Sequence, residues 1–128
     1  MEYPCPCCGY LVFLEPPGSY DICPVCDWED DALQLEFATT LAGGANRSTL
    51  TQSQENFRRF GACEESSVRF CRAPGDTPRD PAWRPIDPAR DWFEDFDAPE
   101  HPRAPDESGA LYYWRGSFWR RSIADGPR

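Results

Sequence analysis

The sequence contains no lysine and only one histidine and one methionine. Thirteen arginines supply every other basic side chain, a bias that codon usage in a GC-rich genome explains better than a need for guanidinium groups. The single histidine, His101, lies between Glu100 and Pro102 in a proline-rich stretch, where we expect an exposed loop. Its isolation disfavours hydrolases and nucleases that depend on histidine. Glycine-rich phosphate loops and nucleophile elbows are also missing, so we predict that the protein is not an enzyme.

Long hydrophobic runs are absent too. No segment approaches the roughly 20 apolar residues that a membrane-spanning helix requires. Residues 1–4 contain neither the basic region nor the apolar run of a secretory signal. We therefore expect a cytoplasmic protein, whose thiols stay reduced. In that compartment clustered cysteines favour a metal site, and an odd number of cysteines, seven, does not suit a framework of disulfides alone.

The composition predicts a modest core and many loops. The hydrophobic fraction of the 128 residues is 40%, and eight of the fourteen prolines fall within residues 73–106. The net charge of −9 disfavours a general nucleic-acid-binding protein, because nucleic-acid affinity depends on neutralising phosphates.

The sequence does contain two matched pairs of cysteines. Cys5 and Cys8 form one C-x-x-C motif, Cys23 and Cys26 form the second, and fourteen residues separate the two motifs. Two such loops, joined by enough chain for a hairpin, present four thiolates to one tetrahedral metal ion. We predict that these four cysteines bind zinc (Zn²⁺) in a closed structural site. Iron in a rubredoxin-like electron carrier is the alternative, because tetrahedral thiolate geometry suits either metal.

The residues around the two motifs are typical of metal-binding loops. The residue after the second cysteine often needs a positive φ, which Gly9 adopts without strain and Asp27 tolerates better than most residues. Pro6 and Pro24 fix φ near the start of each loop. A thiol–disulfide oxidoreductase is disfavoured, because the reactive C-x-x-C motif of that class lies at the start of a helix.

Three cysteines lie outside the two pairs. Cys7 is inside the first loop, where we expect an inert thiol, with a redox or second-metal role as the alternative. Cys63 and Cys71 are eight residues apart, and we expect both to act as small buried hydrophobic residues.

Local patterns predict strands between the two motifs and an extended segment after them. The apolar run 10–14, the turn 15–19 and the run 20–22 predict a hairpin like that of a zinc ribbon. Apolar residues alternate with polar ones over 33–37, which predicts a short strand or extended loop.

One helix is predicted from about Leu50 to Phe60. Thr49 and Gln52 form a capping box at its start, in which each side chain bonds to the backbone of the other residue. Gly61 suits the left-handed position that ends many helices.

Five short runs resemble the cysteine-rich CPCC domain family of mostly bacterial proteins: 3–10, 23–26, 28–31, 43–46 and 60–64. The resemblance covers roughly residues 1–85 and implies the metal unit and the early helix, but it supplies no reaction. We predict a small α+β protein. Its domain 1–85 contains a four-cysteine zinc-ribbon (rubredoxin-like) hairpin and the helix, and 86–128 form a wrapping extension rich in proline, aromatic residues and arginine.

An acidic run follows the second motif directly. Glu29, Asp30 and Asp31 are expected to form a solvated face, and a docking patch for a basic partner is the alternative. Asn46 and Glu64 belong to runs shared with the family. We expect them to hydrogen-bond the helix to the ribbon, and a ligand pocket formed with Arg58 or Arg59 is the alternative.

The segment 111–121 mixes aromatic residues with cations. We predict a final strand pair, or a strand and a turn, whose aromatic side chains cover the ribbon. Such mixtures also occur at interfaces and can stack on nucleic-acid bases. The residues concerned are Trp114, Arg115, Trp119, Arg120 and Arg121.

The functional hypothesis is a zinc-binding, non-enzymatic interaction module that binds or neutralises a basic protein. The acidic charge, the missing catalytic residues and the aromatic–arginine segment favour it. The alternatives are a rubredoxin-like iron electron carrier and single-stranded nucleic-acid binding through the C-terminal segment.

Overall fold

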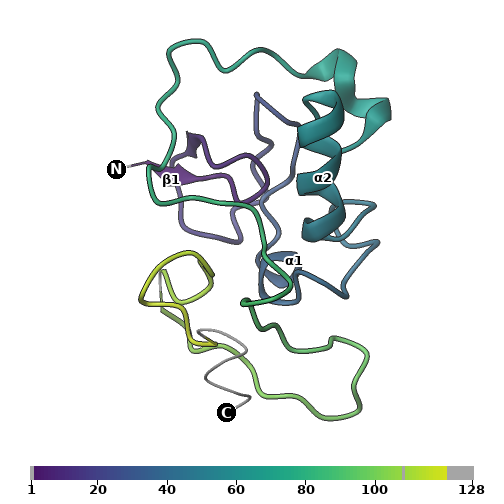
Figure 1. The fold of residues 1–128 in the computed structure, drawn as a ribbon, viewed down its shortest axis with the longest axis vertical. Coiled ribbons are helices and arrows are strands. Elements are labelled where there is room, and N and C mark those ends of the chain that lie inside the picture. Colours follow the sequence, from purple (N-terminus) through teal and green to yellow (C-terminus); the bar gives the residue numbers. More distant parts are fainter. Residues whose placement is uncertain (1, 108, 121–128) are drawn as a thin grey trace.

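A computed structural model describes residues 2–107 and 109–120, in which short helices and strands are joined by long loops (Figure 1). The strands β1 (Tyr3–Pro4) and β2 (Leu11–Phe13) come first and form a two-stranded sheet. The helices α1 (Ala32–Glu36) and α2 (Leu50–Phe60) follow, and then the 3-10 helix η1 (Glu65–Phe70). The prediction of a small α+β protein is therefore confirmed at the level of its fold class.

The strand pairing differs from the predicted hairpin. β2 pairs antiparallel with β1, with Tyr3 opposite Phe13, and the first cysteine loop connects the two strands. The segment 20–22 pairs instead with the chain after the second cysteine loop, since Ile22 and Glu29 form an antiparallel bridge. The prediction that 10–14 pairs with 20–22 is wrong, because each cysteine loop is closed by its own flanking residues.

The helix α2 confirms the predicted span and both of its ends. The hydroxyl of Thr49 accepts a hydrogen bond from the Gln52 N–H at 3.1 Å, so it caps one of the free amides of the first turn. The Gln52 side chain donates to Asn56 at 2.9 Å instead of completing the capping box. Gly61 ends the helix with φ 77°, in the left-handed conformation that glycine adopts readily.

The helix α1 contradicts the extended segment predicted at 33–37. Asp31 caps it, because the carboxylate accepts from the N–H groups of Leu33 and Gln34 at 2.9 and 3.3 Å. Gln34 is fully buried, and its side-chain amide donates to three backbone carbonyl groups of the following loop. The alternation of apolar and polar residues did not predict this helix, because the polar residue Gln34 faces the interior.

The core is built around the two cysteine loops. One cluster contains apolar residues from the two cysteine loops, from the chain between and after these loops, and from the C-terminal segment. Its buried members include Phe13, Val25, Trp28, Leu35, Leu50, Tyr112, Tyr113, Trp114 and Phe118. The C-terminal aromatic residues therefore share a core with the cysteines, although about 90 residues of sequence separate them.

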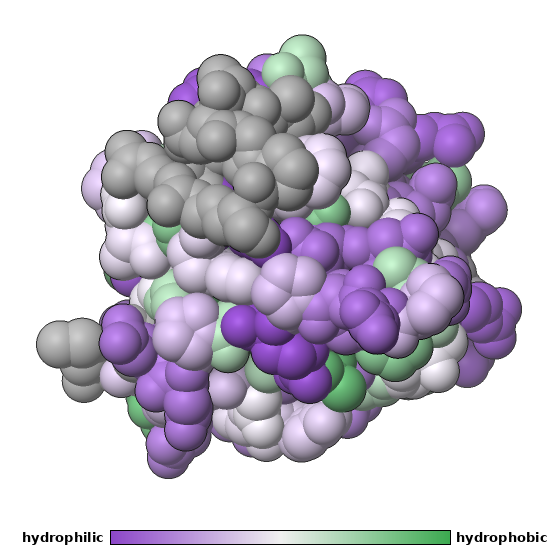
Figure 2. Space-filling model, turned by 90° about the horizontal axis from the view of Figure 1, so that it is seen from below, coloured by the Kyte–Doolittle hydropathy of each residue, from purple (hydrophilic) through white to green (hydrophobic). Residues whose placement is uncertain are grey.

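The C-terminal segment differs in its local structure from the predicted strands. Residues 109–120 form consecutive turns, and Arg121 lies outside the described residues. Phe93 packs against Tyr113 and Phe118, with ring centroids 5.7 and 5.8 Å apart. Seen from below, the surface is mostly hydrophilic, and hydrophobic residues form only small separate spots (Figure 2). Within the described residues no helix is long and apolar enough to cross a membrane.

Candidate metal centre

The four cysteines of the two motifs meet at one point inside the protein. The Sγ atoms of Cys5, Cys8, Cys23 and Cys26 all lie within 4.8 Å of one another, and all four residues are buried. The Sγ atoms of Cys5 and Cys26 are 3.6 Å apart, and those of Cys8 and Cys23 are 3.7 Å apart. Each of these two distances joins one loop to the other, so both loops contribute equally to the cluster.

These distances fit a tetrahedral metal ion. Four sulfurs at about 2.3 Å from a central zinc ion lie about 3.8 Å from one another, which is the edge of the tetrahedron. Disulfide sulfurs, in contrast, are only about 2.05 Å apart. All seven cysteines are free thiols in the structure. The donor set therefore suits one ion with four thiolate ligands.

The two loops share one backbone conformation. The N–H group of Gly9 donates to the Cys5 carbonyl at 2.6 Å, and that of Asp27 donates to the Cys23 carbonyl at 2.9 Å. Gly9 has φ 82° and Asp27 has φ 72°, so the predicted positive φ after each motif is confirmed. The sequence identified this conformation because few residues other than glycine, asparagine and aspartate adopt it.

Burial and hydrogen bonds between the thiols shift the pKa values of the clustered cysteines. Burial raises the pKa of Cys5 and of Cys26, because a thiolate loses its hydration in the core. Hydrogen bonds from Cys26, Cys5 and Cys8 lower the pKa of Cys23, because they stabilise its thiolate. Four thiolates together need a cation to compensate their charge, and a divalent ion leaves a net charge of about −2.

Three further cysteines lie outside this cluster. Cys7 is fully buried, and burial raises the pKa of its thiol. Cys63 is buried too, and its N–H group donates to the Cys26 carbonyl at 2.8 Å. Cys71 is only half-buried, and its Sγ donates to the Ser67 carbonyl at 3.3 Å. The prediction of a small buried residue is therefore confirmed for Cys63 and not for Cys71.

Side chains from distant parts of the sequence cover the first cysteine loop. The Pro6 carbonyl accepts hydrogen bonds from the Gln54 side chain of α2 at 2.9 Å and from the Trp83 indole at 3.0 Å. The Cys8 carbonyl accepts from the Arg79 Nε at 2.9 Å. The spacing of the cysteines gave no signal for these contacts, because the residues that make them are 48 to 77 positions away.

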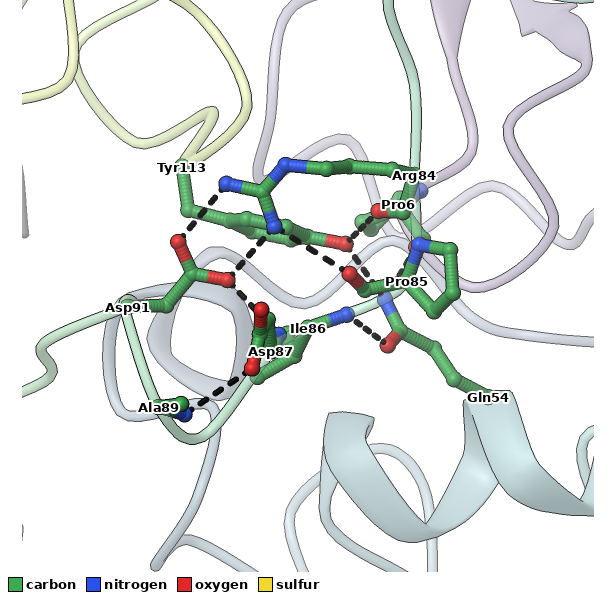
Figure 3. A network of polar contacts seen from close by, with 9 residues as sticks. All are labelled: Pro6, Gln54, Arg84, Pro85, Ile86, Asp87, Ala89, Asp91 and Tyr113. Carbon is green, nitrogen blue, oxygen red and sulfur yellow. Dashed lines mark hydrogen bonds and ion pairs between the residues drawn. The ribbon is translucent and has the colours of Figure 1, made fainter.

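A polar network continues outward from Gln54 (Figure 3). The Gln54 amide also donates to the Tyr113 hydroxyl at 2.9 Å and accepts from the Ile86 N–H at 2.8 Å. The Tyr113 hydroxyl donates in turn to the Arg84 carbonyl. Arg84 binds the buried Asp91 carboxylate through both terminal nitrogens, each at 2.7 Å. Each of these buried polar side chains thus has a partner, as buried polar atoms require.

The acidic run after the second motif is largely internal. Asp30 is buried and accepts from the Ser19 hydroxyl at 2.6 Å, and burial raises the pKa of its carboxyl group. Asp31 is buried as the cap of α1 and also accepts from the Ala45 N–H at 3.0 Å. The prediction of a solvated face is therefore wrong for Asp30 and Asp31, whereas Glu29 is half-buried.

Asn46 joins the second cysteine loop to α1. Its side chain accepts from the Glu29 N–H and donates to the Glu29 carbonyl, both at 2.8 Å, and it donates to Gln34 at 3.0 Å. Glu64 instead accepts from Ser48. Asn46 and Glu64 line one pocket, but the arginine beside them is Arg47. Arg58 is exposed and pairs with a glutamate of its own helix, so the predicted alternative with Arg58 does not form.

His101 and the C-terminal cations also differ from expectation. His101 is half-buried, with its ring centroid 4.9 Å from that of Phe37, so it is not an exposed loop residue. Arg115 pairs with Asp80 at 2.8 Å, and the buried Arg120 pairs with Glu94 at 2.8 Å. These arginines have acidic partners within the protein.

The aromatic residues of the same segment also face inward. The Trp114 indole donates to Asp80 at 3.0 Å, and Trp119 is half-buried. Burial alone would raise the pKa of Asp80, but hydrogen bonds from Arg115 and Trp114 outweigh it and lower the pKa. Trp114 and Arg115 thus help to hold the C-terminal segment against the core.

Comparison with known proteins gives one family. The family model described as Cysteine-rich CPCC matches residues 3–77, which include both cysteine motifs, α1, α2 and η1. No curated protein matches the chain. Arg79 and Trp83, two of the three side chains that cover the first cysteine loop, fall beyond the matched region, whereas Gln54 lies within it.

Proposed function

The chain belongs to the cysteine-rich CPCC family, and from this premise and the cysteine geometry we propose that it binds one zinc ion through Cys5, Cys8, Cys23 and Cys26. The observation that supports the proposal most directly is the pair of sulfur–sulfur distances between the loops, 3.6 and 3.7 Å. They agree with the edge of about 3.8 Å expected for zinc thiolate ligation.

The proposed role of the ion is structural. Four protein ligands complete a tetrahedral shell and leave no position for water or substrate, whereas catalytic zinc keeps one position open. The ion then contributes to folding, and it offsets the unfavourable burial of several thiolates. In this proposal residues 1–85 form the zinc-ribbon domain and residues 86–128 an extension that covers it.

Iron is the second candidate ion, because a shell of four thiolates binds either metal. The two loops also share the turn with a positive φ that the rubredoxin-like hypothesis expects. Elemental analysis of untagged protein, purified from cells supplied with both metals, distinguishes them. We expect one zinc per chain and a colourless protein. One iron per chain and a red protein would support the electron carrier, and absence of stoichiometric metal would contradict the site itself.

We further propose that the protein is an interaction module for a basic protein. The supporting observation is charge: 22 acidic residues exceed 13 basic ones, and within residues 2–107 and 109–120 five arginines are paired with carboxylates of the same chain. Single-stranded nucleic acid is the less favoured partner, because Trp114 and Arg120 are buried.

Affinity purification from the native host tests this second part. A basic partner should be retained by the zinc-loaded protein and released by increasing salt, since exposed charges are screened over about 8 Å at physiological ionic strength. Retention that does not change with salt, or recovery of the chain without any partner, would contradict it. If zinc-free protein recovers the partner equally well, the interaction does not depend on the metal.

A further inference from the structure

Residues 78–80 lie beside the first cysteine loop like an added strand. Tyr10 and Arg79 form an antiparallel bridge. On either side of it, the Leu11 N–H donates to the Pro78 carbonyl at 2.9 Å, and the Asp80 N–H donates across to the loop at 2.9 Å. In Figure 1 this part of the chain returns from η1 and passes alongside β1. The backbone of Arg79 is thereby fixed against the loop that supplies Cys5 and Cys8.

The Arg79 side chain is fixed as well. Its Nε donates to the Cys8 carbonyl at 2.9 Å. Its guanidinium carbon lies 4.7 Å from the ring centroid of Tyr10 and 4.7 Å from that of Trp83. A cation this close to two aromatic rings is attracted to both. The Trp83 indole in turn donates to the Pro6 carbonyl, so the cation and the indole hold two successive parts of one loop.

The second cysteine loop has no equivalent. The Pro24 carbonyl accepts from the Arg72 N–H at 3.2 Å, and the Cys26 carbonyl accepts from the Cys63 N–H at 2.8 Å. Both donors are backbone groups. Within residues 2–107 and 109–120, no charged side chain donates to a carbonyl of this loop. The guanidinium contact is therefore specific to the first half of the site.

We propose that Arg79 is a positioning residue for the metal centre, which holds the first cysteine loop in its metal-binding shape and sets how tightly the ion is retained. This inference rests on the metal-binding function proposed above and goes beyond it. A site of four thiolates and one divalent ion has a net charge of about −2. Arg79 adds a fixed positive charge on the backbone of a ligand residue. Groups that hold the ligands of a metal commonly change its affinity by about 10- to 100-fold.

The inference is tested with zinc and a competing chromophoric chelator. We expect Arg79→Ala to weaken zinc binding by about 10- to 100-fold and to speed transfer of zinc to the chelator. Arg79→Lys retains the charge but lacks the planar group, so it should restore part of the affinity. Arg72→Ala is the matched control, because Arg72 is exposed like Arg79 but its guanidinium donates only to residues 73–77 and to no carbonyl of a cysteine loop. That variant should stay within about threefold of the original protein, since an exposed charge without a contact to the loop contributes little.

Loss of stability alone must be separated from a role at the site. Thr49→Ala removes the cap of α2 and so lowers stability without touching a cysteine loop. A cadmium-113 spectrum of the cadmium-loaded protein reports the sulfur environment, and it should shift in Arg79→Ala but not in Thr49→Ala. Equal zinc affinity and an unshifted resonance in Arg79→Ala would overturn the inference while leaving the metal site intact. Failure of the unmodified protein to bind zinc would instead overturn the proposed function, and this inference with it.

Discussion

Gly9 is constrained in two ways, by its backbone conformation and by a side chain that packs against it. It has φ 82°, and a Cβ atom placed on it would lie 2.5 Å from the Trp83 ring. The positive φ was predictable, because the residue follows a C-x-x-C motif. The contact with Trp83 was not, because 74 residues of sequence separate the two.

Gly9→Ala is predicted to destabilise the zinc-loaded protein by about 2–5 kcal/mol. The left-handed backbone accounts for about 1–2 kcal/mol, and the clash with Trp83 accounts for about 1–3 kcal/mol. Urea unfolding measures the sum. Gly43→Ala is the control, because Gly43 has φ 75° but no atom within 4 Å of the added Cβ. Equal losses in the two variants would show that Trp83 does not press on the loop.

Cys71 is predicted to be the thiol of the zinc-loaded protein that a thiol reagent modifies first. It is half-buried whereas the other six cysteines are buried, and burial raises its pKa to about 11. Because the thiolate is the reactive form, its fraction increases about tenfold per pH unit below that pKa. Iodoacetamide labelling between pH 7 and 9 should therefore accelerate steadily and be absent in Cys71→Ser. A rate that levels off near pH 8.5 would indicate an unperturbed thiol.

At the scale of elements, α1 depends on a cap that the sequence pattern did not reveal. Asp31 accepts from two amides of the first turn and from the Ala45 N–H. Asp31→Ala should therefore cost about 1–3 kcal/mol in urea unfolding. Its neighbour Glu29 is half-buried, and Glu29→Ala should change stability by less than about 0.5 kcal/mol. Equally small losses of stability in the two variants would indicate that Asp31 is solvated, as its acidic neighbours suggested.

The two helices show what local sequence can predict. The ends of α2 were predictable, because Thr49 and Gly61 act on their immediate neighbours. The helix α1 was not, because the buried Gln34 is polar and its partners are carbonyls up to 14 residues further along the chain. The strands failed for a related reason. Composition identified β2, but its partner was set by how each cysteine loop closes on its own flanks.

At the scale of the whole molecule, the metal site and the C-terminal extension share one core. The aromatic residues Tyr112 and Tyr113 pack in the same cluster as the four cysteines of the two motifs. Sequence spacing identified the four clustered cysteines because both pairs are local. It could not identify the covering layer, since Gln54, Arg79 and Trp83 reach the first loop only after the chain has folded back.

Removing zinc is therefore predicted to unfold the loops and the extension together. Structural zinc contributes about 10–16 kcal/mol in zinc-finger peptides, as much as the whole stability of a small domain, about 5–15 kcal/mol. Hydrogen exchange after chelation should show equal loss of protection at two amides: that of Cys5, which donates to Tyr10, and that of Trp119, which donates to Ala110. Added zinc should restore both. Protection retained at Trp119 alone would mean that the extension folds independently.

The central claim is that two sulfurs from each loop bind a single ion. X-ray absorption at the zinc edge of the purified protein tests it most directly. The account predicts one shell of four sulfur atoms at about 2.3 Å, with no nitrogen or oxygen ligand. A shell that contains lighter atoms, or fewer than four sulfurs, would contradict it.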